Sequence, residues 1–130
     1  MKGSTITETA VTQELLDDIV SRILGVVRPL RIVLFGSAAR GVIGPHSDLD
    51  ILVVMPDGTH RRGTAQRLYR SLFGLGVPKD IVVVTESDVR SYGANPSLVI
   101  ASALAEGREL YQVSYHPKKW IIRLLKLSLG

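Results

Sequence analysis

Cysteine is absent from the 130 residues of the chain, which excludes a disulfide framework and a thiolate metal site. No run of 18 apolar residues is present either, so we predict no transmembrane helix. The first ten residues lack the apolar core of a secretory signal, and this favours a cytoplasmic protein. A chain of this length is expected to fold as one domain around an ordinary hydrophobic core.

A surplus of positive charge is also missing from most of the chain. The formal net charge is +4, from 16 Lys and Arg against 12 Asp and Glu, and a basic surface can bind nucleic acid or membranes. All 12 acids and 12 of the cations lie in residues 1–111, however. We therefore divide the chain into a neutral body, residues 1–111, and a basic tail, residues 112–130, and we do not expect a nucleic-acid substrate.

The tail combines its four cations with Trp120 and several aliphatic residues, and Pro117 can start a helix there. A basic amphipathic helix of this kind can lie on a membrane surface. Because the body is neutral, we favour instead that the tail docks on the body or forms a homo-oligomer contact.

Apolar residues recur at helical spacing in three segments, and short apolar runs bounded by turns predict three strands between them. This alternation predicts an α/β (or α+β) core. In the second helix, Tyr69 and Phe73 have the spacing of core residues, while its four arginines indicate a solvated face. The sequence leaves open whether the first two strands run parallel or antiparallel. The predicted helices cover 12–27, 61–73 and 98–106, and the predicted strands cover 31–35, 49–55 and 80–84.

Three aspartates mark the starts of the second and third predicted strands. Asp48 and Asp50 are one residue apart, so their side chains share a face. Asp80 begins the next strand, and the three carboxylates converge if these strands are neighbours. Clustered carboxylates repel one another unless a cation neutralises them. Mg²⁺ prefers such oxygen ligands, and two ions held here could stabilise the attacking and leaving oxygens of an in-line displacement.

A glycine-serine turn follows the first strand. Gly36 allows a tight turn and a close backbone approach to a ligand. Ser37 stands at the start of a predicted helical turn, 38–42, where free N–H groups attract phosphate. Arg40, one turn further on, could reach the same anion. Phosphate and metal would then meet at one site, which indicates nucleoside triphosphate chemistry.

These residues together form a motif. The tripeptide Phe35-Gly36-Ser37, ten intervening residues and then Asp48-Leu49-Asp50-Ile51 resemble the signature of the DNA polymerase β nucleotidyltransferase superfamily. The extended form GSAARG…SDLDILV is similar to the minimal nucleotidyltransferases (MNT) of prokaryotes. The resemblance implies a small mixed β-sheet of three or more strands flanked by helices.

The resemblance also implies an enzymatic activity. Such proteins transfer a nucleoside monophosphate, usually AMP from ATP, to a hydroxyl and release pyrophosphate. Asp48 and Asp50 would bind two Mg²⁺ ions, with Mn²⁺ as a substitute, and Asp80 would complete the metal that activates the acceptor. Gly36 and Ser37 would hold the triphosphate, with Arg40 nearby.

The resemblance to MNT proteins further implies a partner. These proteins are antitoxins encoded beside HEPN-domain toxin RNases, and some neutralise the toxin by adding AMP to one of its tyrosines. Two alternatives stay open. The chain could neutralise its toxin by binding alone, or it could modify a small molecule, as aminoglycoside nucleotidyltransferases do, in a pocket built by dimerisation.

Overall fold

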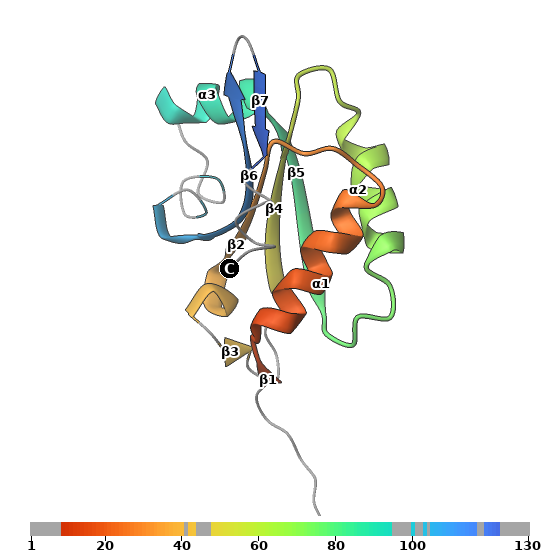
Figure 1. Ribbon diagram of the computed structural model, residues 1–130. Helices are drawn as coiled ribbons and strands as arrows, with labels where there is room; N and C mark the ends of the chain where they lie inside the picture. The colour runs from red at the N-terminus through yellow and green to blue at the C-terminus, as the bar shows by residue number, and fades with distance from the viewer. Residues whose placement is uncertain are drawn as a thin grey trace, which may run out of the picture.

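The computed structural model describes residues 9–40, 42–43, 48–94, 100, 103, 105–116 and 119–122. Helices lie on both faces of a central sheet (Figure 1), and this confirms the predicted α/β class. The helices are α1 (Gln13–Leu24), α2 (Arg61–Ser71), α3 (Glu86–Ala94) and the 3₁₀ helix η1 (Gly36–Arg40). The sheet strands are β2 (Arg31–Phe35), β4 (Leu49–Met55), β5 (Lys79–Thr85), β6 (Arg108–His116) and β7 (Lys119–Ile122), beside a small pair, β1 (Thr9–Ala10) and β3 (Val42–Ile43).

The main sheet is mixed, with the strand order β5-β4-β2-β6-β7. Strand β4 runs antiparallel to β2 and parallel to β5, whereas β6 runs antiparallel to both β2 and β7. The pairing settles the relative direction of β2 and β4, which the sequence left open. Strand β2 is central in the sheet, because it is paired along both of its edges, with β4 and with β6.

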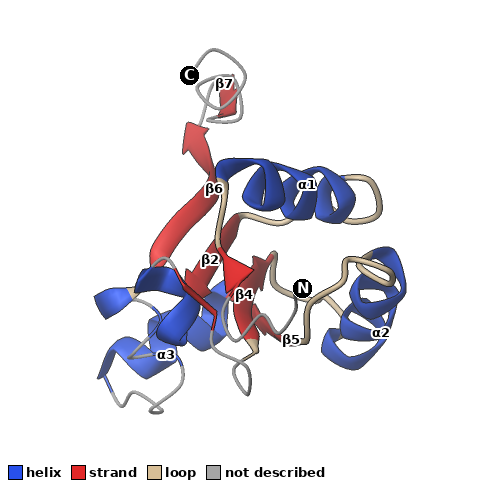
Figure 2. Cartoon of the chain, turned by 90° about the horizontal axis from the view of Figure 1, so that it is seen from below, coloured by secondary structure: helices blue, strands red, loops and turns tan. Residues whose placement is uncertain are grey.

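Each face of the sheet carries its own hydrophobic cluster, because side chains alternate along a strand. On one face, Leu49 and Ile51 of β4 pack with residues of α1 and α2. On the other, Leu52 packs with Ile100 and with residues near α3. Figure 2 shows α1 and α2 on one side of the strands and α3 on the other. Asp50 is the single residue of β4 that is not buried.

Helix α1 begins where the sequence predicts. The Thr12 side chain accepts a hydrogen bond from the backbone N–H of Leu15 at 3.1 Å, which satisfies one of the free donors of the first turn. The helix ends at Leu24, three residues before the predicted end at residue 27. The backbone N–H of Gly25 closes its last turn on the carbonyls of Ser21 and Arg22.

Two residues of the second helix do not lie in the core as predicted. Phe73 is 82% exposed and Tyr69 is 41% exposed. Helix α2 ends at Ser71, so Phe73 lies beyond the helix, and the helical spacing does not apply to it. Tyr69 lies over the edge of the sheet, because α2 packs beside the edge strand β5. Most of the predicted helix 98–106 lies outside the described residues, although Ile100, Ala103, Ala105 and Glu106 are helical.

The prediction of a helix after Pro117 is wrong for residues 119–122. These residues form strand β7, which pairs with the end of β6. Strand β6 itself crosses residue 111, the predicted boundary between body and tail. The β-branched residues Ile121 and Ile122 suit a strand, and pairing with β6 decides the conformation. No helix in the described part of the chain is long and apolar enough to cross a membrane.

Gly107 lets the chain pass close to β2. Its N–H donates to the carbonyl of Ala103 at 2.9 Å. A Cβ at this position would overlap that same carbonyl and the side chain of Val33, and it would come within 3.1 Å of the Leu34 carbonyl. Gly107 follows a helical segment, but its φ is not positive, so a left-handed helix end does not explain the glycine. Lack of space is therefore the reason for glycine here.

We predict that Gly107→Ala lowers the free energy of unfolding by about 1–3 kcal/mol, the usual range for overpacking a close contact. Two of the colliding groups are backbone or buried in the sheet, so they cannot move aside freely. Urea unfolding followed by circular dichroism measures the change.

Gly25→Ala is the control for this prediction. Gly25 has a right-handed conformation (φ −73°), and its added Cβ would come no nearer than 3.3 Å to another atom. Its free energy of unfolding should change by less than about 1 kcal/mol. Equal losses in both variants would contradict the packing argument.

Candidate active site

Strand pairing places two of the predicted carboxylates side by side. Asp50 is paired with Phe35 of β2 on one side and with Asp80 of β5 on the other. Directly paired residues of neighbouring strands present their side chains on the same face, about 5 Å apart. Asp50 and Asp80 therefore lie in one row, at the end of the sheet where β4 and β5 both begin (Figure 1).

Asp48 precedes β4 by one residue and completes this group, which we call the carboxylate cluster (Asp48, Asp50 and Asp80). Asp48 and Asp80 are exposed, and Asp50 is half-buried. Leu49, between the first two, is fully buried in the core on the opposite face. The buried leucine holds both neighbouring aspartates at the surface end of the strand, as the alternation of side chains in the sequence predicts.

The carboxylate cluster is electrostatically costly. Burial raises the pKa of Asp50 above its ordinary value, and the charges of Asp80 and then Asp48 raise this pKa further. None of the three carboxylates forms an ion pair with Lys or Arg in the described part of the chain. Among the described residues their negative charge therefore has no Lys or Arg counter-ion, as in a site that binds a cation.

The donor set of the cluster fits a hard divalent cation such as Mg²⁺, which prefers carboxylate oxygens and keeps several waters. Within the described ranges, no three His, Cys, Asp or Glu side chains are arranged closely enough to surround an ion as they stand. A bound cation would neutralise the carboxylates and remove the repulsion between them.

Gly36 connects the turn after β2 with the carboxylate cluster. Its φ of +72° lies in the left-handed region, which residues with a side chain rarely adopt. A Cβ at Gly36 would also overlap Oδ2 of Asp50. Glycine is therefore required twice, for the turn and for the space that the carboxylate occupies. The sequence predicts the turn and a close approach to a ligand, but it does not indicate the contact with Asp50.

The predicted helical turn at 38–42 occurs two residues earlier, as the 3₁₀ helix η1. Within η1, the side chain of Ala38 is buried. The side chains of Ser37 and Arg40 lie outside the part of the chain that the structure describes, so their roles at a phosphate stay predictions.

Tyr69 is a member of this site that the sequence does not indicate. Its hydroxyl donates a hydrogen bond to Oδ1 of Asp80 at 3.1 Å and accepts one from the backbone N–H of Ile81 at 3.0 Å. Helical spacing suggested a core residue, because nothing in the sequence shows that α2 packs at the edge of the sheet beside β5.

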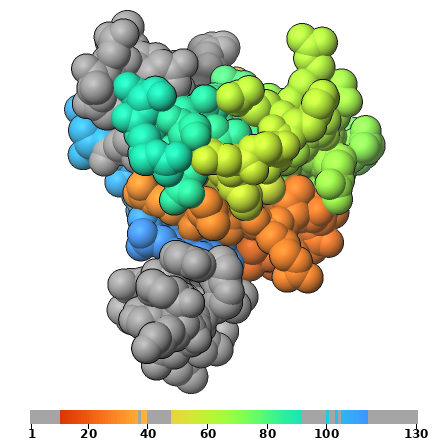
Figure 3. Space-filling view, turned by 90° about the horizontal axis from the view of Figure 1, so that it is seen from above, coloured from red at the N-terminus to blue at the C-terminus, as the bar shows by residue number. Residues whose placement is uncertain are grey.

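Two other aspartates, Asp57 and Asp88, have turn and cap roles at the opposite end of β4 and β5. Asp88 accepts from the N–H of Thr85 at 2.9 Å and receives two hydrogen bonds from Arg61, at 2.7 and 2.9 Å. These bonds lower the pKa of Asp88 to about 2. Asp57 accepts from the N–H of Ser87 at 2.7 Å. Figure 3 shows the start of α2 and α3 side by side. Both aspartates therefore serve the fold.

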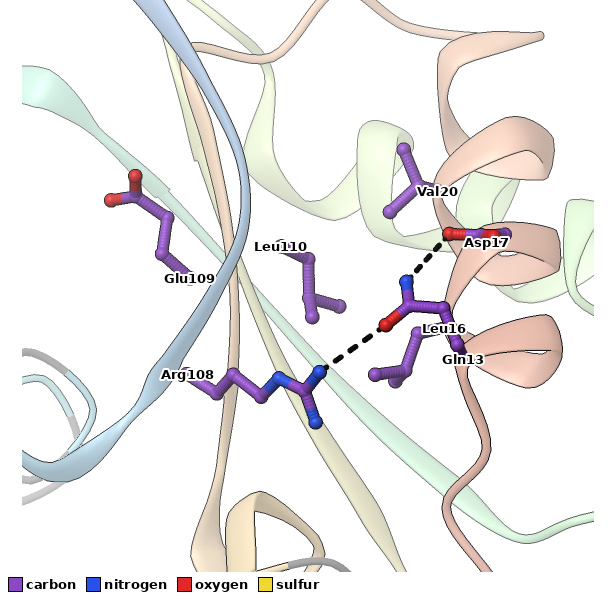
Figure 4. A pocket seen from close by; sticks show the side chains of 7 residues that line it. All are labelled: Gln13, Leu16, Asp17, Val20, Arg108, Glu109 and Leu110. Carbon is purple, nitrogen blue, oxygen red and sulfur yellow. Dashed lines mark hydrogen bonds between the residues drawn. The ribbon is translucent and has the colours of Figure 1, made fainter. Parts of the chain in front are cut away.

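A pocket between α1 and β6 is too small for a nucleotide. Figure 4 shows its polar rim, where Arg108 donates to Gln13 and Gln13 donates to Asp17. Its volume is about 80 Å³, whereas pockets for small-molecule ligands usually hold about 300–1,000 Å³. It also lies on the face that α1 covers, opposite to the face of Asp50.

Comparison with known proteins gives a family match over most of the chain. The family model described as nucleotidyltransferase domain matches residues 14–124. The chain is 32% identical over 91 residues to bifunctional uridylyltransferase/uridylyl-removing enzymes of Burkholderia thailandensis and Burkholderia pseudomallei. It is 30% identical over 92 residues to that of Burkholderia vietnamiensis. These alignments cover 66–67% of this chain and 10% of each relative. No solved structure matches the chain significantly.

The raised pKa of Asp50 predicts a pH-dependent effect of Asp50→Asn in the absence of metal. An acid whose pKa is higher in the folded state destabilises the fold once it ionises. Stability due to Asp50 is therefore complete below its ordinary pKa of 3.8 and is lost as the pH rises through the raised value. Relative to the unsubstituted protein, Asp50→Asn should gain stability between about pH 3.5 and pH 7. Urea unfolding with a chelator present measures this difference.

Asp88→Asn is the matched control, because the pKa of Asp88 is shifted in the opposite direction. Asp88 stabilises the fold above its ordinary pKa of 3.8, and this contribution is lost as the pH falls toward about 2. Asp88→Asn should therefore be less stable than the unsubstituted protein near neutral pH, with a smaller difference in acid. The same pH trend in both variants would show that Asp50 is not in a repulsive cluster.

Proposed function

The chain belongs to the nucleotidyltransferase domain family, and we propose that it transfers a nucleoside monophosphate from a triphosphate to a hydroxyl group, with release of pyrophosphate. The observation that carries this proposal is the carboxylate cluster. Asp50 and Asp80 are paired across two parallel strands, Asp48 stands beside them, and none of the three has a cationic partner in the described residues.

In this reaction the acceptor oxygen forms a bond to the α-phosphorus, and the bond from that phosphorus to the pyrophosphate oxygen breaks. Asp48, Asp50 and Asp80 would hold two Mg²⁺ ions, or Mn²⁺ in their place, which neutralise the triphosphate and lower the pKa of the acceptor hydroxyl. Asp80, which is exposed at the start of an edge strand, would receive the proton of that hydroxyl. Gly36 leaves room for the carboxylate of Asp50. The turn that contains Gly36 would bind the triphosphate, together with Ser37 and Arg40.

For the donor we propose ATP, and UTP is a second candidate. The resemblance of the motif to MNT proteins supports ATP. The Burkholderia relatives are uridylyltransferases, and this favours UTP. The chain spans about a tenth of the length of those relatives. Similarity to them therefore does not imply that this chain has the full activity of the longer enzymes.

For the acceptor we propose a hydroxyl on a partner protein, namely a HEPN-like toxin that the chain neutralises as an antitoxin. Asp48 and Asp80 are exposed, so a side chain of another protein can reach the cluster from solvent. The same exposure would serve a small molecule, such as an aminoglycoside, if a second subunit completed the pocket.

Thermal unfolding in the presence of nucleotides tests the donor before any acceptor is known. A ligand that binds only the folded state raises its stability, by about 2.7 kcal/mol at a hundredfold excess over the dissociation constant. We expect ATP with Mg²⁺ to raise the melting temperature, and we expect neither component to do so as strongly alone. A larger rise with UTP would reassign the donor, and the absence of any rise with all four nucleotides would contradict the proposal.

Transfer itself is tested with ATP or UTP labelled at the α-phosphate, Mg²⁺, and the protein encoded beside the gene. We expect label on that protein, and we expect Asp50→Asn to reduce the rate by about 100-fold or more, as is usual when a group that stabilises transition-state charge is removed. Asp88→Asn makes the same chemical change at a residue that serves only the fold, so it should retain activity under conditions where it is folded.

Undiminished labelling by Asp50→Asn would show that the cluster is not the catalytic site. Labelling of hydroxylated small molecules instead of the protein would support the aminoglycoside-type alternative. Full neutralisation of a toxin by the Asp48→Asn/Asp50→Asn variant in cells would show that binding alone suffices.

A further inference from the structure

Tyr69 makes two hydrogen bonds with consecutive residues of β5. Its hydroxyl donates to Oδ1 of Asp80 at 3.1 Å, and it accepts from the N–H of Ile81 at 3.0 Å. Strand β5 is the edge strand of the sheet, so the Ile81 N–H can point outward, away from β4. The hydroxyl is held between the backbone of the strand and the carboxylate beside it.

The hydrogen bond from Tyr69 restrains a side chain that would otherwise turn freely. Asp80 is exposed, and it has the like charge of Asp50 beside it. Repulsion favours rotation of the Asp80 carboxylate away from the cluster. Tyr69 fixes Oδ1, and Oδ2 has no hydrogen-bond partner within the residues that the structure describes.

A phenol suits this position better than a cation would. It donates a hydrogen bond without bringing positive charge, so it does not neutralise the cluster or repel a divalent ion. Arginine fills the corresponding role at Asp88, where it lowers the carboxylate pKa to about 2 and satisfies both oxygens. The two aspartates thus differ in their partner, and of the two only Asp80 has an oxygen with no hydrogen-bond partner among the described residues.

We infer that Tyr69 is a positioning residue, which holds the Asp80 carboxylate in the orientation that a divalent cation between Asp80 and Asp50 requires. This inference rests on the proposed function, because it assumes that the cluster binds the cation. Hydrogen-bond partners of metal ligands restrict the orientation of those ligands, and loss of such a partner usually lowers metal affinity or activity by about 10- to 100-fold.

The test uses the full chain and the variant Tyr69→Phe, which removes only the hydroxyl. Mn²⁺ binding, in the presence of a non-hydrolysable triphosphate, is followed by the electron paramagnetic resonance signal of the free ion. We expect the dissociation constant for Mn²⁺ to rise by about 10-fold. We also expect the Ile81 amide to exchange its hydrogen faster than in the unsubstituted protein, because it loses its acceptor.

Tyr111→Phe is the matched control. Tyr111 is buried on β6, where it is paired with Ile32 of β2, and two strands separate it from β5. This variant should leave both the Mn²⁺ affinity and the exchange of Ile81 unchanged. Equal Mn²⁺ affinity in Tyr69→Phe and Tyr111→Phe would overturn the inference, even if Ile81 exchanges faster, since the hydroxyl would then serve the strand alone.

Asp50→Asn separates failure of the inference from failure of the proposed function. If Asp50→Asn binds Mn²⁺ as tightly as the unsubstituted protein, the cluster is not the metal site and both ideas fail. If Asp50→Asn loses binding while Tyr69→Phe keeps it, the metal site stands and only the role of Tyr69 is wrong. Should Tyr69→Phe fail to fold, slow exchange of Ile81 in the unsubstituted protein is still required, and rapid exchange there would refute the hydrogen bond.

Discussion

The site depends on repulsion among Asp48, Asp50 and Asp80. Burial of the residues on either side of Asp50 keeps these like charges close to one another. Leu49 and Ile51, on either side of Asp50, are fully buried, so Asp50 cannot turn away without exposing core residues. Burying one such side chain is worth about 1.5–3 kcal/mol, and β4 contains six buried residues. Parallel pairing with β5 then places Asp80 in the same row. The fold therefore holds these like charges close together, and a bound cation would relieve their repulsion.

The immediate neighbours of the cluster keep this charge available. Gly36 has no side chain where Oδ2 of Asp50 lies, and Tyr69 bonds to Asp80 as a neutral donor. At the opposite end of β4 and β5, by contrast, arginines pair with the acids that serve the fold. Arg61 pairs with Asp88, and Arg90 pairs with Asp57 and Glu86. Acids that serve the fold thus have cationic partners, whereas the acids of the cluster have none in the described residues.

Membership of the nucleotidyltransferase domain family agrees with this distribution of charge. The family match extends over residues 14–124 and so includes both the carboxylate cluster and strand β7. The Burkholderia relatives devote only a tenth of their length to the segment that this chain resembles. An acceptor supplied by a partner protein suits a cluster that is open to solvent on its Asp48 and Asp80 side.

Short-range patterns in the sequence determined the strands at 31–35 and 49–55, the start of α1 next to Thr12 and the shared face of Asp48 and Asp50, because these features depend on neighbours a few residues away. Tertiary structure alone decided that β2 and β4 run antiparallel, that Asp80 is paired with Asp50, and that 119–122 form a strand. It also placed Tyr69 on Asp80 and Asp50 against Gly36. These contacts join residues far apart in the chain, and strand order, which no local pattern encodes, brings them together.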